Sequence, residues 1–585
     1  MASNRQLDLA RRSQASQVKF LRGFPFLVLL LVTSSWVAAA QQPASDDDRL
    51  AASKKAYSEK NWEETARIAN GPTTQPAELD YLHGMALMHL ERWDEARVTF
   101  SAGQKKAPKD YRFLAERGGA EYRLKDFAAA KKDLRSVLRF EPKDEYTLEF
   151  LGTIYLLEGN LEATLKYWNR IEKPRLASVA LEPKPQANEK LVSSAVAFSA
   201  PQVMTTDSWL ATEARLKNLG VFPQSRLELA PVGETDYLAT LHLSELKGFG
   251  GSKWSALISL LSGVPYETIY PEWYDLGDRA INFSSLLRWD AQKRRAFAVL
   301  SSPAEGRADR VVSFFVDARN ENWNLSQIFS GSSSPITNLN LRKIEAGAEL
   351  RFAMNGNWSW TAGAGVMGRT FQKEGTGLSP GAAPFFTSGT SLEGWLKAKR
   401  TLVRVAERRF AVEGSAESRF GRGFKDELGP FGSLGGVVQA KWLPHARGED
   451  DAVKFQLRES NMFGNVPLDQ LFVLGLDQDT SLWLRGHGAT IDGKKGRAPL
   501  GRRYVLLNSE YDKTLYDGGF FRVQAGPFVD MGKVADASGV FGDPRWLVDT
   551  GIQMKLRVLG NVSVVISYGR DLRNGRGAFF GTTEH

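Results

Sequence analysis

The order of apolar and polar residues along this chain follows two different patterns, and the pattern changes near residue 275. From there to the C-terminus, apolar residues recur at every second position in segments of about ten, separated by Gly, Asn and Asp turns. In TGIQMKLRV, the even positions from 552 to 558 are apolar and the odd positions from 553 to 557 are polar. Period-two alternation predicts β-strands with one apolar and one polar face.

The stretch FFRVQAGPFVDM at 520–531 shows what the two faces would contact. Its odd positions from 521 to 531 are apolar, whereas Arg522, Gln524 and Asp530 share the other face. One face suits lipid and the other a water-filled lumen, so we expect residues 249–585 to form a transmembrane antiparallel β-barrel of about 16 strands. A soluble β-sandwich would show the same alternation and remains the alternative.

The region 47–178 has a longer repeat instead. Corresponding small residues and prolines recur 34 positions apart, and they form a repeat signature: Gly84, Ala96, Pro108, Gly118, Ala130, Pro142 and Gly152. Small residues allow paired helices to cross closely, and a proline follows the second helix of each pair. This pattern resembles the tetratricopeptide repeat and predicts an all-α array that binds partner segments. An ordinary helical bundle is the alternative.

Residues 179–248 connect these two regions. The prolines of EKPRLASVALEPKPQ indicate a linker, which we place at 179–192. A helix is predicted after Thr205 and Thr206, with Gly220 as its C-terminal stop, and two short alternating strands follow it. The sequence LKNLGVFPQSRLEL and the later DYLATLHLSEL resemble the end of a POTRA module, which we place at 193–248. It is short for such a module, as if one helix were missing, and a generic α+β domain is the alternative.

The N-terminus and the composition narrow the cellular setting. Basic residues precede the apolar run FPFLVLLLV, and Ala38 and Ala40 form a small-x-small site, so residues 1–40 are expected to be a secretory signal peptide. An uncleaved membrane anchor is the alternative. The chain has no cysteine, which excludes disulfides and thiol chemistry. Its net charge of +9 is not concentrated in a basic block, so no nucleic-acid partner is expected.

Three segments near the C-terminus carry a further resemblance. VPLDQLFVLGLDQDTSLWLRGH resembles the segment of the BamA and bacterial surface antigen superfamily that leads into its Arg-Gly turn, at Arg485 and Gly486. YVLLNSEYDK resembles that superfamily's next strand, with Glu510 facing inward. PFVDMGKVAD resembles the following Phe-x-Asp-x-Gly strand, with Phe528, Asp530 and Gly532. His487 departs from the pattern, because an aromatic residue usually follows the Arg-Gly pair.

The resemblance implies a site without covalent chemistry. An Arg that faced lipid would cost roughly 2 to 4 kcal/mol, so Arg485 is expected to lie on a loop folded into the lumen. There it would pair with Asp530, with Glu510 as a second acceptor, and hold the loop by directional, charge-assisted hydrogen bonds. A solvated loop arginine near unrelated acids is the alternative.

The fold class expected from these patterns is therefore multidomain α+β: a repeat array, a small POTRA-like module and a membrane barrel. The resemblance implies that such a protein is located in the bacterial outer membrane with its N-terminal domains in the periplasm. Its partners would be the lipid bilayer, client polypeptides and periplasmic accessory proteins, and it would assist insertion or translocation of the clients. A polysaccharide export porin with a repeat scaffold and a plain structural barrel are the alternatives.

Enzymatic interpretations find little support. The stretch GAGVMG at 363–368 matches the G-x-G-x-x-G pattern but lies within an alternating run, not between a strand and a helix. G-x-S-x-G occurs once, as GLSPG at 377–381, within the Gly- and Pro-rich stretch GTGLSPGAAP and not at a strand-to-helix turn. The six histidines, at 83, 89, 242, 445, 487 and 585, show no metal-ligand spacing. We therefore expect no enzyme activity, no cofactor and no metal site.

Overall fold

The computed structural model describes residues 45–233, 236–325, 338–374, 383–424, 428–446, 448, 451–536, 541–558 and 562–584. The expected signal peptide at 1–40 lies outside these residues. The chain divides into two compact units, one made mainly of residues up to Ile154 and one running from Tyr155 onward. Among the described helices, none is both long and apolar enough to span a membrane.

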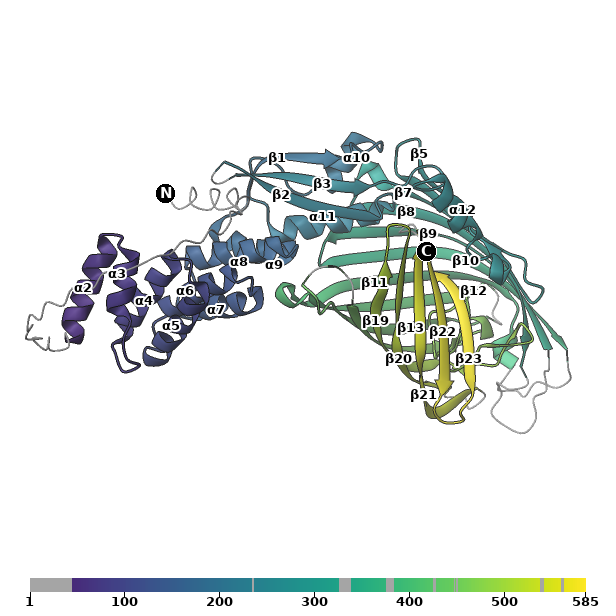
Figure 1. Ribbon diagram of the computed structural model, residues 1–585. Helices are drawn as coiled ribbons and strands as arrows, with labels where there is room; N and C mark the ends of the chain where they lie inside the picture. Colours follow the sequence, from purple (N-terminus) through teal and green to yellow (C-terminus); the bar gives the residue numbers. More distant parts are fainter. Residues whose placement is uncertain are drawn as a thin grey trace, which may run out of the picture. The chain divides into compact units, whose positions relative to one another are not determined.

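The first unit is a series of antiparallel helix pairs, labelled in Figure 1. Its helices are α2 (Asp46–Ser58), α3 (Trp62–Ala69), α4 (Ala77–His89), α5 (Trp93–Lys106), α6 (Arg112–Arg123), α7 (Phe127–Phe140) and the first part of α8 (Glu145–Leu157). Successive helices from α2 to α7 pack on one another. Helix α3 begins after Asn61 and helix α7 after Asp126, and each of these side chains accepts a backbone N–H of the first turn.

The small residues of the repeat signature lie where the helices cross, and its prolines lie in the turns between them. Ala96 and Ala130 are fully buried. A methyl group added at Gly84 would lie 2.4 Å from the Phe100 ring, so only glycine lets α4 approach α5 this closely. Pro108 lies in the turn between α5 and α6, and Pro142 lies in the turn between α7 and α8. The spacing of 34 residues therefore corresponds to one helix pair.

A small α/β module follows within the second unit, after α9 (Leu161–Trp168). It contains β1 (Arg175–Glu182), α10 (Glu189–Ala195), α11 (Thr206–Leu219), β2 (Gln224–Val232) and β3 (Asp236–Ser244). The strands form a sheet in the order β1-β3-β2, with β1 parallel to β3. The helices and strands enclose a core that includes Leu176, Leu191, Trp209 and Leu241.

Two of the expected boundaries are wrong. Residues 179–192 are not a bare linker, because the end of β1 and the start of α10 lie there. The prolines that suggested a linker flank a short strand, because Pro174 precedes β1 and Pro183 and Pro185 follow it. This strand forms by pairing with β3, which lies far along the chain, so its own sequence does not reveal it. Helix α10, which was not expected from the sequence, is present in this module beside α11. The barrel also begins later than residue 249, because α12 (Lys253–Leu261) precedes its first strand.

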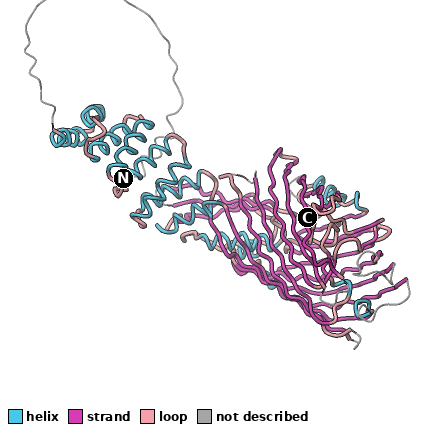
Figure 2. The backbone as a smooth tube through the Cα atoms, turned by 90° about the horizontal axis from the view of Figure 1, so that it is seen from below, coloured by secondary structure: helices cyan, strands magenta, loops and turns pink. Residues whose placement is uncertain are grey.

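The rest of the chain forms an antiparallel barrel whose hydrogen-bonded strand order closes into a ring. Figure 2 shows the strands wrapping side by side into a wall. The wall begins with β4 (Thr268–Ile269), β5 (Glu272–Leu276), β6 (Ile281–Arg288), β7 (Lys293–Pro303), β8 (Arg310–Asn324), β9 (Asn338–Asn355) and β10 (Trp358–Glu374). It continues with β11 (Gly389–Val405), β12 (Phe410–Gly423), β13 (Phe431–Trp442) and β14 (Asp451–Gly464). It ends with β19 (Arg503–Asp517), β20 (Phe521–Ala535), β21 (Gly542–Val558), β22 (Val562–Asp571) and β23 (Gly577–Glu584).

The prediction of helices followed by an antiparallel barrel is confirmed. β14 pairs directly with β19, and the ring order places β23, the last strand, beside β4, the first. We refer to this junction as the seam. G-x-G-x-x-G at 363–368 lies inside β10, which pairs with β9 on one side and β11 on the other, so it is part of the wall.

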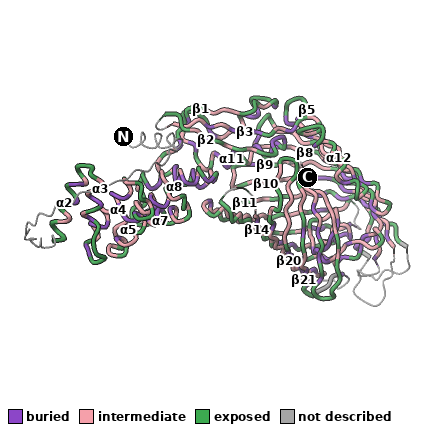
Figure 3. The backbone as a smooth tube through the Cα atoms, viewed as in Figure 1, coloured by how far each residue is buried: buried purple, intermediate pink, exposed green. Residues whose placement is uncertain are grey.

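The wall is apolar outside and polar inside. Along its strands, intermediate and exposed residues predominate (Figure 3). Large apolar side chains of the strands are at least 41% exposed, among them Phe314, Ile344, Leu392, Leu396, Leu434, Phe455, Val529, Ile552 and Phe579. Polar and charged side chains of the same strands are buried, among them Asp317, Glu321, Arg369, Glu393, Arg458, Asp512, Asp530, Asp549 and Gln553. This is the reverse of the distribution in a soluble protein.

One end of the barrel carries the α/β module. Helix α11 lies along β9 and contacts β8 (Figure 1). Asn218 donates its side-chain N–H to the Ala308 carbonyl at 3.0 Å, and Asn282 donates to the Leu219 carbonyl at 2.8 Å. The turn between β11 and β12 is held by α9, because the Glu407 carboxylate lies 2.7 Å from Lys166 Nζ. These contacts join the module to the strand turns of one rim.

Candidate functional site

The candidate site is built by a long segment between β14 and β19, residues 465–502, which we call the inner loop. It contains four two-residue strands: β15 (Phe472–Val473), β16 (Thr490–Ile491), β17 (Lys494–Lys495) and β18 (Leu500–Gly501). Its apolar residues Leu474 and Leu484 are fully buried against Leu506 of β19 and Val534 of β20. Other residues of the loop contact β6, β7 and β8, so the loop lies inside the ring and touches distant parts of the wall.

Arg485 is the centre of the loop's attachment to the C-terminal strands. Its Nη2 lies 2.7 Å from Asp530 Oδ1 and its Nε lies 2.8 Å from Asp530 Oδ2, which is a bidentate pair. Its backbone N–H donates to the same Oδ2 at 3.0 Å. Its Nη1 donates to Gln553 at 2.7 Å and to Glu510 at 3.1 Å. With 3% of Arg485 and none of Asp530 exposed, this charge pair is removed from bulk water.

A second set of charged and polar residues lies next to Arg485 and holds the side chains that accept its hydrogen bonds. Lys555 Nζ lies 2.9 Å from Glu510 Oε1 and 2.7 Å from Asp512 Oδ2. Lys454 lies 3.2 Å from each of the same carboxylates. Gln553 donates to both Glu510 and Asp512 at 2.8 Å. Because every acid of this set has a basic partner, the cluster can stay ionised inside the barrel.

The strand that carries Asp530 also shapes the space for the loop. The Arg485 guanidinium lies over the Phe528 ring, 3.8 Å from its centroid, in a cation–π contact. A methyl group added at Gly532 would lie 3.2 Å from Cδ1 and Cδ2 of Leu484. The structure thus brings together the sequence-predicted residues Arg485, Glu510, Phe528, Asp530 and Gly532.

Gly486 and His487 contact the next two strands. The Gly486 N–H donates to Asp549 Oδ2 of β21 at 2.6 Å. His487 Nδ1 lies 3.0 Å from the same oxygen, and its Nε2 lies 3.4 Å from Asp571 Oδ2 at the end of β22. A methyl group at Gly486 would lie 2.6 Å from the Asp571 backbone nitrogen, so the loop needs glycine here for close approach.

The opposite end of the loop is tied to the N-terminal strands. Asp479 lies 2.9 Å from Arg288 Nη1 of β6 and 2.9 Å from Arg295 Nη1 of β7. Lys495 donates to Glu321 of β8 at 2.8 Å. Burial opposes the charge of Asp479, but Lys495 and the surrounding arginines hold the pKa of this carboxyl well below its usual range. The acid is therefore ionised throughout the physiological pH range.

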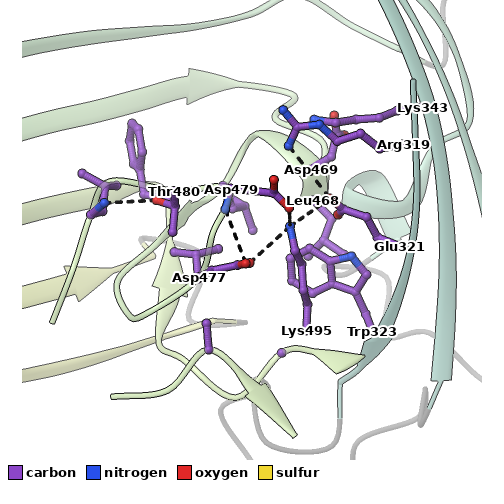
Figure 4. Close-up of a pocket in the computed structure, with 16 residues that line it drawn as sticks. Arg319, Glu321, Trp323, Lys343, Leu468, Asp469, Asp477, Asp479, Thr480 and Lys495 are labelled. Carbon is purple, nitrogen blue, oxygen red and sulfur yellow. Dashed lines mark hydrogen bonds and ion pairs between the residues drawn. The ribbon is translucent and has the colours of Figure 1, made fainter. Parts of the chain in front are cut away.

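These ion pairs line a cavity of about 190 Å³ between the loop and strands β8 and β9. Figure 4 shows Lys495 directed at Asp477 and Glu321, with Arg319 and Lys343 above them. The cavity is lined by similar numbers of cations and acids, and most of them form short ion pairs with one another. These ion pairs join the inner loop to the wall.

Several of these residues were not predicted from the sequence. Gln553, Asp549 and Asp571 lie on strands far from Arg485 in the chain, and only the strand register brings them to the loop. Asp477 and Asp479 are visible as two acids ahead of the Arg-Gly pair, but the sequence does not show that they reach β6 and β7. His487 was assigned to no site, although it lies between two buried carboxylates.

The repeat unit offers a separate surface. Helices α5 and α6 and the turn before α4 border an open groove of about 550 Å³. It is lined by Thr73, Arg97, Val98, Ser101, Ala102, Lys105, Lys106, Arg117 and Glu121. Burial and the neighbouring Asp133 carboxylate raise the pKa of Glu121 to about 7. The groove therefore holds an acid that titrates near neutral pH.

Comparisons with known proteins give similarity at the level of structure only. No family profile matches the sequence, and no curated protein matches it. The chain is similar to BamA from Haemophilus ducreyi lacking POTRA domains 1–3, with 12% identity, a TM-score of 0.40 and coverage of 70% of this chain and 84% of the other. It is similar to CdiB from Escherichia coli, with 12% identity, a TM-score of 0.45 and coverage of 71% and 75%. Over 22% of its length it is similar to MamA, with 14% identity and a TM-score of 0.21.

Proposed function

We propose that this chain is an outer-membrane barrel of the BamA and surface antigen type that assists the insertion or translocation of client polypeptides. The observation that carries the location is the reversed distribution of side chains on the wall. Exposed Phe314, Ile344 and Ile552 would be costly in water and favourable in lipid, while the charges face inward. The expected leader at 1–40 agrees with export from the cytoplasm.

The type of barrel is supported by the inner loop. Arg485, Asp530 and Gly532 occupy the positions that the resemblance assigns to a loop latch, and the bidentate geometry is the one such a latch requires. A pore for a bulky polysaccharide would need an unobstructed lumen. Here the loop is held to both the N-terminal and the C-terminal strands, which disfavours the porin interpretation.

The mechanism proposed for the clients uses the seam between β4 and β23. A strand edge exposes a row of backbone donors and acceptors, so an opened seam could pair with a strand of the client. β4 has two residues and β5 has five, so β23 meets a short edge there, which requires few hydrogen bonds to part. The inner loop binds strands on both sides of the seam, β6 to β8 and β20 to β22, and would restrain its opening.

The N-terminal unit would gather the clients on the periplasmic side. Stacked helix pairs of this kind present extended surfaces to partner segments. The groove beside α5 and α6 has a volume of about 550 Å³ and is lined by charged, hydroxyl and apolar side chains. Periplasmic accessory proteins could use the same surface. No step in this mechanism forms or breaks a covalent bond.

The function is tested by depleting the protein and measuring the outer membrane. We expect other outer-membrane proteins to decrease in folded amount while surface polysaccharide per cell is unchanged. Complementation with Arg485→Ala should fail, whereas complementation with Arg503→Ala, which removes an exposed ion pair with Glu459, should succeed. Loss of surface polysaccharide with normal outer-membrane proteins would contradict the proposal and support the export alternative.

A further inference from the structure

Three aspartates lie side by side on the inner face of the C-terminal strands. Asp530 of β20 is the register partner of Asp549 of β21, which is the register partner of Asp571 of β22. Their exposed fractions are 0%, 0% and 1%. Like charges opposite each other on neighbouring strands are destabilising, and more so when buried. Arg485 neutralises Asp530, so Asp549 and Asp571 need positive charge from another source.

His487 lies between these two carboxylates. Its Nδ1 is 3.0 Å from Asp549 Oδ2 and its Nε2 is 3.4 Å from Asp571 Oδ2. A neutral imidazole can donate to only one of them. His487 is also the residue at which this chain departs from the aromatic side chain expected after Arg-Gly, so it places a nitrogen ligand where a ring without one is usual.

One carboxylate oxygen of each aspartate accepts a hydrogen bond from a backbone N–H, and the other oxygen accepts none from a described residue. Asp549 Oδ2 accepts the Gly486 N–H at 2.6 Å, and Asp571 Oδ1 accepts the Arg573 N–H at 2.9 Å. Asp549 Oδ1 and Asp571 Oδ2 are buried without a hydrogen-bond donor in the part of the chain that the structure describes. A buried carboxylate oxygen without a donor is costly, and carboxylates oriented by backbone N–H groups are typical of metal ligands.

We infer that His487, Asp549 and Asp571 form a binding site for a divalent transition-metal ion such as Zn²⁺. One ligand atom from each residue lies within 4.8 Å of the other two. Ligands bound at roughly 2.0 to 2.1 Å in a tetrahedral arrangement are about 3.3 Å apart, close to the 3.4 Å between His487 Nε2 and Asp571 Oδ2. Asp549 Oδ2 faces the other ring nitrogen, Nδ1, so Asp549 must turn its unpartnered Oδ1 toward the Nε2 side to complete the ligand set. One imidazole and two carboxylates suit Zn²⁺, and Mn²⁺ less tightly.

Such an ion would extend the attachment of the inner loop. Arg485 ties the loop to β20, whereas a metal at His487 would tie it to β21 and β22, nearer to the seam. It would also supply more positive charge to Asp549 and Asp571 than the single charge of a protonated His487. The site rests on these three residues alone, and its test is independent of the proposed function in client insertion.

The experiment measures metal binding by the intact, purified protein in detergent micelles. After removal of metals with EDTA, Zn²⁺ and then Mn²⁺ are titrated by calorimetry into the natural protein, His487→Gln and Asp571→Asn. The control is His445→Gln, because His445 is exposed and pairs with Asp451 at 2.9 Å, outside the cluster. Heat-modifiable migration on gels establishes that each barrel is folded, and the isosteric Asp571→Asn stands alone if His487→Gln does not fold.

We expect one Zn²⁺ per chain, with binding unchanged in His445→Gln and at least tenfold weaker in both cluster variants. Loss of a ligand should cost no less than the about 10 to 100-fold that loss of a ligand's hydrogen-bond partner costs. Zn²⁺ should also slow proteolysis within 465–502 in the natural protein. Equal binding in the variants would overturn the inference. A second result would also overturn the inference: resistance of the loop to protease that is the same with Zn²⁺ and with EDTA but decreases as pH rises through the range in which histidine loses its proton. In that case a protonated His487, and not a metal ion, neutralises the aspartates.

Discussion

Arg485 supplies two kinds of donor to one acceptor, because its guanidinium and its own backbone N–H both donate to the Asp530 carboxylate. A buried carboxylate that loses its guanidinium keeps its charge without compensation, and the cost is larger than the net value of the pair. Residue-scale effects in this barrel should therefore be strongly asymmetric. Buried pairs of the inner loop matter, whereas pairs of similar length on the surface contribute little.

The first prediction concerns this pair. Arg485→Ala or Asp530→Asn should weaken docking of the inner loop by about 3 to 5 kcal/mol, since one charge is left buried and unpaired. The measurement is the rate of protease cleavage within 465–502 in outer membranes. Arg503→Ala is the matched control and should change docking by less than about 1 kcal/mol. Equal protection of the loop in Arg485→Ala and in the natural protein would show that the pair does not hold it.

The second prediction compares two glycines of the same loop. Gly486→Ala should displace the loop, because its methyl group would lie 2.6 Å from the Asp571 nitrogen and 2.7 Å from Asp549 Cγ. Gly488→Ala should be tolerated, because no atom lies within 4 Å of the corresponding position. The measurement is the rate of protease cleavage within 465–502 in each variant. Equal cleavage rates in the two variants would contradict the close approach of Gly486 to β21 and β22.

At the scale of elements, strand periodicity could be read from the sequence and register could not. The alternation in FFRVQAGPFVDM correctly placed Val529 outside and Asp530 inside, because a strand has only two faces. Which inward residues meet depends on the pairing of strands, so Gln553, Asp549 and Asp571 were missed. β1 was missed for the same reason, since its eight residues become a strand only by pairing with β3.

A third prediction concerns the other attachment of the loop. Asp479→Asn leaves Arg288 and Arg295 without a shared carboxylate, which should cost about 3 to 5 kcal/mol and loosen the strands that follow the seam. The temperature at which the barrel loses its compact migration on gels should fall. Asp492→Asn, at an exposed turn of the same loop, is the control. An unchanged transition in Asp479→Asn would contradict a role for this end of the loop.

A fourth prediction concerns pH and the helical unit. The raised pKa of Glu121, about 7, means that the folded state keeps a proton that the unfolded state releases near its ordinary value of 4.5. The contribution is therefore favourable at low pH and is lost as pH rises from about 4.5 to about 7, by about 1 to 3 kcal/mol. Glu121→Gln should remove this loss.

The measurement for Glu121 is thermal unfolding of the intact protein, followed by the helical circular dichroism signal at pH 5 and pH 8. Glu121→Gln should raise the transition temperature at pH 8 more than at pH 5, while Glu59→Gln, at an exposed position, should not. The same shift in both variants, or none in Glu121→Gln, would mean that burial of Glu121 does not limit the stability of this unit.

At the scale of the whole molecule, the chain combines a wall with an apolar outer surface, a loop held inside it and a helical unit, which we propose binds clients. The 34-residue spacing and the period-two alternation were enough to predict the helical array and the barrel, because both depend on patterns local in the chain. The order of strands around the ring and the double attachment of the loop depend on contacts between distant residues. They required the structure.

The most direct test of this account is a disulfide between the loop and the wall in intact outer membranes. The chain contains no cysteine, and a side chain at Gly532 would begin 3.2 Å from the Leu484 side chain, so Leu484→Cys with Gly532→Cys leaves Arg485 and Asp530 in place. Leu484→Cys with Val529→Cys is the control, because Val529 faces outward. We predict that the first pair forms a disulfide in a barrel that remains heat-modifiable, and that the control pair does not. Failure of the first pair under oxidant, in a folded and membrane-inserted barrel, would contradict the account, because the loop would then not lie inside the wall.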